Sequence, residues 1–273
     1  MTKKYLKYNG ITFNDDTPYP FYSFIPNEGT AEAQTDIAVL KDGALYSNFR
    51  YNERLVSLKG HITGNDEEEL IKNKQLLYIK CNGKTKSTLF WYDGYKEYKA
   101  EAVASIPVLS EKKGLCYEFN INFIIPGFYW EEANETSVPL FQRKNDVCME
   151  FMPPCIFTSR TTGTVYINNT DFPIYPKIEF LVEETSEYDL IITNETTGAI
   201  IELGDFQVTE GDIIVIDTEN MTALHNGIDI INSFNDFSDF HLTPGENVLS
   251  ITNGGIEVNS SVMMKFYKKF VGV

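Results

Sequence analysis

Hydrophobic and polar residues alternate with a period of two along most of the chain. Residues 54–62 read RLVSLKGHI, and comparable runs rich in Val, Ile, Thr, Phe and Tyr recur as far as residue 266. Successive side chains of a β-strand point to opposite faces of a sheet, so this period predicts strands that bury one face. β-branched and aromatic residues favour the same structure. The pattern therefore predicts a mainly β protein.

One segment has the pattern of a helix. Residues 66–80 begin with four acidic residues, carry lysines towards the end, and place Leu70 and Leu77 on one face. That charge order suits the helix dipole. Asn65 is the predicted N-cap, with Glu68 three residues later in the manner of a capping box. A single amphipathic helix is therefore expected, packed on a sheet.

Turn residues divide the chain into two predicted domains. Asn82-Gly83 and Asp93-Gly94 separate strand-like segments, and residues 100–106 and 117–125 complete a first sheet. A Pro-Gly break and the polar stretch 131–137 follow that sheet. We expect an N-terminal β-sandwich-like domain with one helix over residues 1–132 and a second domain over residues 133–273.

The second half has no helical period and predicts a β-sandwich. Strands of about 5 to 8 residues are separated by turn residues, a spacing typical of sandwiches and jelly rolls. Several sets of apolar residues share one strand face: Ile178, Phe180 and Val182; Ile214 and Ile216; Leu249 and Ile251; Val262, Met264 and Phe266. Asn226-Gly227 predicts a hairpin turn with two positive φ values.

Composition and charge narrow the class of protein. The 273 residues carry 23 Lys and Arg against 39 Asp and Glu, a formal net charge of −16 that argues against specific binding of nucleic acid. No apolar stretch approaches the roughly 18 residues of a membrane-spanning helix, and no secretory signal is present, so we expect synthesis in a cytosol and no membrane partner. The four cysteines are predicted to be reduced and half-buried: Cys81, Cys116, Cys148 and Cys155.

The chain contains no recognisable catalytic, cofactor or metal motif. The nucleophile elbow, the dinucleotide fingerprint and the phosphate-binding loop are all missing from the sequence. The residues that could carry chemistry have simpler structural interpretations. We interpret His61, His225 and His241 as polar strand or turn residues, the pairs Glu131-Glu132 and Glu183-Glu184 as solvated acids, and residues 235–239 as a turn. Trp91 and Trp130 are interpreted as core anchors, and the sequons mark Asn-rich loops: Asn134, Asn168, Asn194, Asn220 and Asn259. We predict no enzyme activity, no cofactor and no metal.

A set of turn and strand residues nevertheless resembles a known family. GDIIVIDT, LHNG and FHLTPGEN follow one another between residues 211 and 247, and this order resembles the C-terminal half of the phage distal tail proteins. RYNERLVSLKG at residues 50–60 and FNINFIIPGFY at residues 119–129 look like their N-terminal domain. The residues that carry the resemblance have structural roles in turns and strands: Arg50, Gly60, Gly211, Asp212, Asp217, Thr218, Asn226, Gly227, Pro244, Gly245 and Asn247.

The resemblance implies a structural protein of the siphophage (or prophage) tail tip. In such proteins the N-terminal domains close into a homohexameric baseplate hub, and galectin-like C-terminal sandwiches project outward. The implied partners are the tail tube protein, the tail-associated adhesin or lysin and the tape measure protein, with a receptor-binding protein or a host glycan as further options. Assembly is expected in the host bacterial cytoplasm. Six copies carry 6 × −16 = −96, and part of this charge could line the channel and repel DNA in transit.

Two other functions fit parts of the sequence. A carbohydrate-binding module would explain a sandwich, an aromatic content of 14% and two Trp residues that could stack on sugars, although no stacking residue can be singled out. A glycosidase or esterase ranks third among the interpretations, because no arrangement of a nucleophile or of acidic residues stands out in the sequence. The structural interpretation is preferred on the resemblance.

Overall fold

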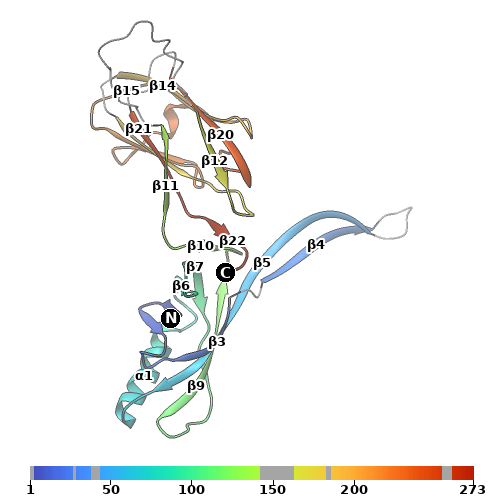
Figure 1. The fold of residues 1–273 in the computed structure, drawn as a ribbon, viewed down its shortest axis with the longest axis vertical. Coiled ribbons are helices and arrows are strands. Elements are labelled where there is room, and N and C mark those ends of the chain that lie inside the picture. The colour runs from blue at the N-terminus through green and yellow to red at the C-terminus, as the bar shows by residue number, and fades with distance from the viewer. Residues whose placement is uncertain (1–2, 27–28, 38–43, 142–162, 183–185, 254–259) are drawn as a thin grey trace, which may run out of the picture. The chain divides into compact units, whose positions relative to one another are not determined.

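The chain folds into two compact units. The computed structural model describes residues 3–26, 29–37, 44–141, 163–182, 186–253 and 260–273. Unit 1 comprises Met1–Asn134 together with Lys269–Val273, and unit 2 comprises Glu135–Lys268 (Figure 1). The sequence placed residues 133–273 in a single second domain, whereas the last five residues return to unit 1. Unit 2 is therefore inserted into unit 1.

Unit 1 is built on one continuous antiparallel sheet of eleven strands. Its central order is β2-β1-β6-β7-β9-β5-β3, with four further strands paired at its margins. The elements of unit 1 are β1 (Tyr5–Tyr8), β2 (Ile11–Phe13), β3 (Phe21–Ile25), β4 (Gly29–Ile37), β5 (Ala44–Thr63), α1 (Glu67–Lys80), β6 (Lys86–Tyr92), β7 (Glu97–Ala104), β8 (Val108–Leu109), β9 (Cys116–Ile125), β10 (Trp130–Glu132) and β22 (Lys269–Phe270).

The strands of unit 1 bury alternate residues in a single core. Val56, Leu58 and Ile62 of β5 and Phe119, Ile121 and Phe123 of β9 belong to it, as the period of two predicts. Helix α1 contributes Leu70 and Leu77, and Asn73 of its buried face donates a hydrogen bond to the Thr63 carbonyl. The predicted helix face is confirmed.

The N-cap of α1 lies one residue later than the sequence predicted. Asp66, rather than Asn65, has extended backbone angles, and its carboxylate accepts a hydrogen bond from the Glu69 amide at 2.8 Å. The Glu69 carboxylate in turn accepts the Asn65 amide at 2.8 Å. The prediction of Asn65 with Glu68 was wrong because the sequence offers two overlapping pairs with the same spacing. The pair that begins with the aspartate is the one used, and an acidic residue suits the positive end of the helix dipole.

Strand β5 is far longer than the sequence pattern indicated. Residues 54–63 pair with β9, whereas residues 44–54 pair with β4 in a two-stranded ribbon that leaves the sheet (Figure 1). Twenty residues at about 3.3 Å each make a strand about 65 Å long. We call β4 and residues 44–54 of β5 the arm, and its base, where Gly29 pairs with Arg54, the arm root.

Unit 2 is a two-layer β-sandwich, as predicted. Six strands in the order β11-β21-β13-β16-β17-β18 face five in the order β12-β20-β14-β15-β19. The elements are β11 (Thr136–Phe141), β12 (Gly163–Asn168), β13 (Lys177–Val182), β14 (Ser186–Asn194), β15 (Ala199–Val208), β16 (Ile213–Asp217), β17 (Thr222–His225), β18 (Ile228–Asp229), the 3-10 turn η1 (Ile231–Ser233), β19 (Phe234–Phe237), β20 (Gly245–Asn253) and β21 (Ser260–Phe266).

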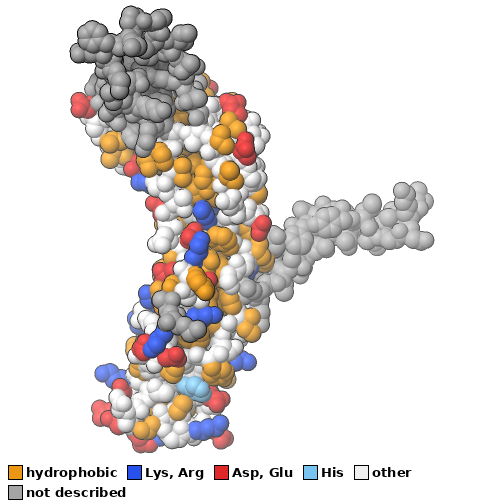
Figure 2. Space-filling view, in the orientation of Figure 1, with side chains coloured by type: hydrophobic (Ala, Val, Ile, Leu, Met, Phe, Trp, Pro, Cys, Tyr) orange, Lys and Arg blue, Asp and Glu red, His pale blue; other side chains and the backbone are white. Residues whose placement is uncertain are grey.

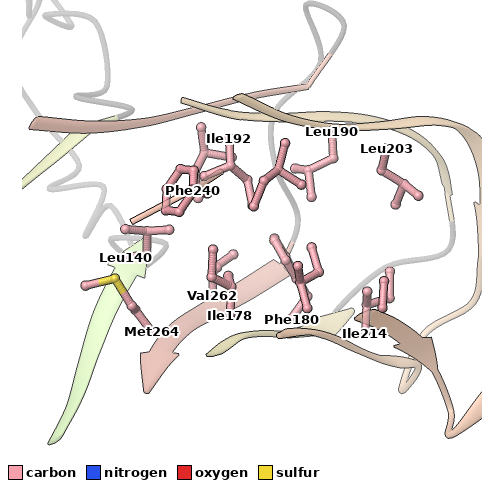
Figure 3. Close-up of a cluster of buried hydrophobic side chains, with 14 of the residues drawn as sticks. Leu140, Ile178, Phe180, Leu190, Ile192, Leu203, Ile214, Phe240, Val262 and Met264 are labelled. Atoms are coloured by element: carbon pink, nitrogen blue, oxygen red, sulfur yellow. The ribbon is translucent and has the colours of Figure 1, made fainter. Parts of the chain in front are cut away.

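The core of the sandwich lies between the two sheets. Leu190, Ile192 and Leu203 point down from one sheet towards Ile178 and Phe180 of the other (Figure 3). Every apolar set that the sequence assigned to a shared strand face is buried here. One local prediction was wrong. The turn predicted over residues 235–239 is largely strand, because residues 234–237 form β19 on the edge of β15, where Phe234 and Phe237 pack against the core.

Within the described residues, no helix combines the length and the hydropathy needed to cross a membrane.

Candidate functional site

The residues considered for chemistry do not converge on a reaction centre. Within the described residues no group of three His, Cys, Asp or Glu side chains is placed to hold a metal ion. His61 lies 3.6 Å from the Cys116 sulfur, His225 pairs with Asp212 and His241 lies beside Asp239. The three histidines therefore have separate local partners.

The cysteines and tryptophans have structural environments. Burial raises the pKa of the Cys81 thiol to about 12, and it also raises the pKa of Cys116. Both thiols are free; Cys116 is half-buried as predicted, whereas Cys81 is fully buried, and Cys148 and Cys155 lie outside the described residues. Trp91 and Trp130 are 5% and 0% exposed, so neither presents a ring face to a sugar.

The two acidic pairs are also accounted for as far as the structure describes them. Glu131 and Glu132 form ion pairs with Lys99 and Lys96 at 3.7 and 3.2 Å. Glu183-Glu184 lies outside the described residues. The Glu131-Glu132 pair is thus a salt-bridged surface feature of β10.

The motif residues gather in three corners of unit 2, the first built by Gly211, Asp212, Asn226 and Gly227. Asp212 accepts hydrogen bonds from the Thr209 amide and the Asn226 side-chain amide, each at 2.8 Å, and it also contacts His225 Nε2 at 2.9 Å. Asn226 also accepts the Ile213 amide at 2.9 Å. The turn before β16 is thereby joined to the β17–β18 hairpin.

Backbone geometry explains the two glycines of this corner. Asn226 and Gly227 have φ of 49° and 84°, the two positive values that the sequence predicted for a hairpin of this type, and Gly211 has φ of 89°. Residues with a Cβ are strained in this region, whereas glycine adopts it freely and asparagine tolerates it. The Asn-Gly pair is therefore a requirement of the turn.

The Asp212 corner predicts a loss of stability in acid. Hydrogen bonds from Thr209, Asn226 and His225 hold the pKa of Asp212 well below its usual value. A depressed pKa in the folded state means that the unfolded chain binds the proton more readily. The stabilisation of the folded state by ionised Asp212 is therefore present above about pH 4, and it falls away as the pH drops through the pKa of the folded state.

We expect the melting temperature of unit 2 in Asp212→Asn to fall less than that of the native chain between pH 5 and pH 3. Asp236→Asn, at an exposed strand position, is the control and should retain the native slope; equal slopes in the native chain and in Asp212→Asn would contradict this account.

The second corner fixes the end of β16. Buried Asp217 accepts the amides of Glu219 and Asn220 at 3.1 and 3.0 Å and pairs with Lys177 at 3.1 Å. Burial alone would raise the pKa of Asp217, but the hydrogen bonds from Asn220 and the charge of Lys177 outweigh it and lower the pKa. Thr218 donates its hydroxyl hydrogen to the Pro176 carbonyl at 2.9 Å. The Asp-Thr pair closes a turn and ties it to the start of the neighbouring strand β13.

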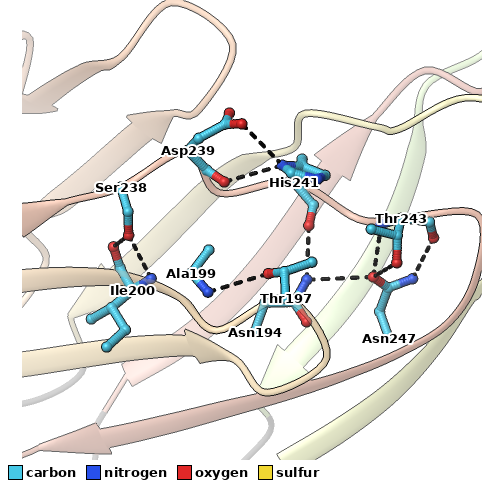
Figure 4. A network of polar contacts seen from close by, with 9 residues as sticks. All are labelled: Asn194, Thr197, Ala199, Ile200, Ser238, Asp239, His241, Thr243 and Asn247. Carbon is cyan, nitrogen blue, oxygen red and sulfur yellow. Dashed lines mark hydrogen bonds and ion pairs between the residues drawn. The ribbon is translucent and has the colours of Figure 1, made fainter.

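The third corner surrounds Asn247, which is fully buried at the start of β20 (Figure 4). Its amide donates to the Thr243 and Gly245 carbonyls at 2.7 and 3.1 Å, and its oxygen accepts the Thr243 amide at 2.8 Å. Asn194, also fully buried, donates to the His241 carbonyl at 2.7 Å and approaches Asn247 Oδ1 at 3.4 Å. Exposed Pro244 and Gly245, with φ of 94°, turn the chain around this pair.

Sequence reasoning missed the roles of Asn194 and Asn168, although a signal was present. In both Asn-x-Thr sequences the asparagine oxygen accepts the amide of the threonine two residues on, at 3.0 Å. This is the Asx-turn pattern, in which a side chain replaces a backbone turn. The sequons at these two sites thus mark turns that are anchored by buried asparagines.

The two motif residues of unit 1 lie in β5. Arg50 pairs with Glu32 in the arm, and its side chain lies outside the described part of the chain. Gly60 pairs with Phe119, and a Cβ there would lie 2.4 Å from the Pro20 carbonyl oxygen and 2.8 Å from the Phe119 ring. Gly60 therefore permits a close approach of β5 to the segment before β3.

Charge is divided unequally between the units. The residues of unit 1 include 17 Lys and Arg and 18 Asp and Glu, a formal net charge of −1, while those of unit 2 include 6 and 21, a net charge of −15. Blue side chains accordingly gather over unit 1 on the face shown in Figure 2. Nearly all of the net charge belongs to the sandwich.

Two protein-family models match the chain, one mainly in each unit. Residues 8–125 match the phage tail protein RIFT-related domain, and residues 169–270 match the C-terminal domain of the siphovirus-type tail component. The two matches cover both units in the order of the family. The chain belongs to the siphophage distal tail protein family. It is thus a structural component of the phage tail tip.

Solved structures share the fold. The crystal structure of the SPP1 Dit protein, a paradigm of the hub adsorption apparatus in phages that infect Gram-positive hosts, matches this chain with a TM-score of 0.73 at 13% identity. The match covers 98% of this chain and 99% of that one. The phage P2 baseplate in its activated conformation matches with TM-scores of 0.53 with Ca (12% identity, 100% of each chain) and 0.52 with Sr (11% identity, 99% of each chain). No curated protein sequence matches the chain. At sequence identities of 11–13%, the similarity to these structures establishes a shared fold and nothing more.

Proposed function

We propose that this distal tail protein is the baseplate hub that joins the tail tube to the tail-associated adhesin or lysin. Unit 1 closes into a homohexameric ring around the channel for the tape measure and the DNA, and unit 2 is free for outward contacts, including a receptor-binding protein or host glycan. The observation that carries the proposal is the succession of two tail-protein domain matches along one chain whose fold matches a hub protein over 98% of its length.

The charge division supports unit 1 as the ring-forming part. A net charge of −1 per copy gives a ring layer of −6, which imposes little mutual repulsion, while the sandwiches carry 6 × −15 = −90. The expectation that part of the total charge lines the channel is not supported by this division. Most of that charge lies on the units assigned to the periphery.

An exposed apolar patch on one sheet face of unit 1 is the surface best suited to a second copy. On adjacent strands β3, β5 and β9 the side chains of Ile25, Leu55 and Ile124 are 45%, 47% and 38% exposed. Leu55 lies directly opposite Ile124, and Ile25 lies opposite Ser57, whose hydroxyl donates to the Asn122 side chain at 2.7 Å. Interface cores are depleted in charged residues and rich in apolar ones.

The ring contact can be tested by placing charge on this face. The double variant Leu55→Glu/Ile124→Glu should shift the mass measured by light scattering from six chains towards one, because an unpaired carboxylate buried in an interface is costly. Val165→Glu/Ile167→Glu is the matched control, since these side chains of unit 2 are 58% and 56% exposed and paired with β20. A hexamer that survives the first change would refute this face as the contact. A native chain that stays single, even beside the tube protein, would refute the ring.

A further inference from the structure

The C-terminal segment occupies a defined position on unit 1. Strand β22 pairs antiparallel with β10, with Phe270 opposite Trp130 and Lys269 opposite Glu131. The Phe270 ring meets Tyr98 edge-on at 5.7 Å, and the buried Lys269 ammonium lies 4.4 Å from the centre of the Tyr129 ring. The segment is thus held by main-chain pairing, an aromatic contact and a cation–π contact.

Arg54 adds a charged group to this position. Its side chain is 1% exposed, and its guanidinium donates hydrogen bonds to the Pro26 carbonyl at 3.1 Å and to the Val271 carbonyl. The Phe128 ring lies 4.7 Å away, and Nε is buried without a hydrogen-bond partner. Burial lowers the pKa of Arg54, and within the described part of the chain no carboxylate forms an ion pair with it.

A buried guanidinium without a counter-ion is costly unless its surroundings replace water. The carbonyls of Pro26 and Val271 and the Phe128 ring supply that replacement here. One of these carbonyls comes from the last three residues of the chain. The C-terminal segment therefore helps to solvate the Arg54 charge, in addition to packing on the sheet.

The position of Arg54 links this segment to the arm. Arg54 pairs with Gly29 of β4 and with Ile125 of β9, so it is the residue at which β5 passes from the sheet into the arm. Pro26 precedes β4 and also accepts a hydrogen bond from Trp130 of β10 at 3.1 Å. Strand β5, the segment before β4 and the C-terminal segment thus meet at the guanidinium of Arg54.

We infer that the arm root of unit 1 contains a binding site for an extended peptide strand, filled here by residues 269–273, and that Arg54 couples occupancy of the site to the order of the arm root. When β22 is seated, the guanidinium donates to the Pro26 and Val271 carbonyls and holds Pro26 in place. When β22 leaves, Arg54 loses a partner and the arm root opens. The C-terminal segment of the chain thereby controls the base of the arm.

Hydrogen exchange on shortened chains tests the coupling. A chain ending at Lys268 should show amide exchange at residues 29–31 and 50–53 faster by about tenfold, the loss expected for one charge-assisted hydrogen bond. A chain ending at Val271 is the control, because it loses the packing of Val273 but keeps β22 and an oxygen on Val271 that can accept from Arg54. It should retain native exchange at the arm root.

Arg54→Met separates coupling from packing. Methionine keeps an apolar stem near Phe128 and removes both donors, so it should raise exchange at the arm root by itself. Combined with the chain ending at Lys268, it should add nothing further there, since the two changes break the same link. Phe270→Ala in the full-length chain should loosen the arm root as well, which keeps the test valid if the shortened chain does not fold.

Two results would overturn the inference. One is unchanged exchange at the arm root in the chain ending at Lys268 and in Phe270→Ala. The other is full additivity of Arg54→Met and the truncation, which would show that each acts through packing alone. Neither result depends on whether the chain forms a ring, because the site lies within one copy of unit 1.

Discussion

Gly60→Ala is expected to destabilise unit 1 by more than about 3 kcal/mol, beyond the usual cost of overpacking a core. The added methyl group would lie 2.4 Å from the Pro20 carbonyl oxygen and 2.9 Å from the Phe21 Cα, both backbone atoms. The Pro20 carbonyl also accepts the His61 amide at 2.7 Å, so it cannot move away without weakening that bond. β3 would have to separate from β5.

Tryptophan fluorescence during denaturant unfolding measures this effect in unit 1 alone, because both tryptophans of the chain, Trp91 and Trp130, belong to its core. Gly127→Ala is the matched control. A Cβ at Gly127 meets no atom within 4 Å and the residue does not require a positive φ, so its unfolding midpoint should stay close to the native value. A native-like midpoint for Gly60→Ala would show that β3 and β5 are not held this closely.

Asn247→Ala is expected to destabilise unit 2 by about 2–4 kcal/mol, because it removes several buried hydrogen bonds and leaves their partners unsatisfied. The carbonyls of Thr243 and Gly245 and the side chain of Asn194 would lose their contacts with Asn247. Asn247→Asp should cost at least as much, since a carboxylate of the same shape faces the two carbonyls without a donor.

Far-UV circular dichroism with parallel tryptophan fluorescence separates the two units. In Asn247→Ala the dichroism should show an early transition from unit 2, while the fluorescence transition of unit 1 stays in place. Glu246→Ala, at the exposed neighbouring residue, should leave both unchanged. Coincident early transitions in both signals would contradict the independence of the two units.

The features that follow from local pattern could be predicted from the sequence. Alternation identified the buried faces of the strands, and Asn226-Gly227 identified a turn, because in each case the cause lies within a few residues. The resemblance that led to the family rests on the same turn residues. Their roles as hydrogen-bond centres, however, depend on partners elsewhere, as in the contact of Asn194 with the His241 carbonyl.

The arm and the C-terminal strand could not be predicted in the same way. β22 has two residues, too few for any period, and its partner β10 lies about 140 residues earlier in the chain. Arg54 did leave a signal, since it is in phase with Val56 and Leu58, which point into the core. An arginine at a core-facing strand position predicts burial. Its hydrogen-bond acceptors, however, are the carbonyls of Pro26 and Val271, and no local sequence pattern connects these two residues with Arg54.

The central claim is that the chain acts through ring geometry, and the most direct measurement is the mass and symmetry of the purified full-length protein. Six chains of 31.1 kDa give a closed ring of about 187 kDa. The account predicts this species by native mass spectrometry, with sixfold particles that have a central opening in negative-stain images. A chain that remains at 31.1 kDa at every concentration, with and without the tail tube protein, would contradict it.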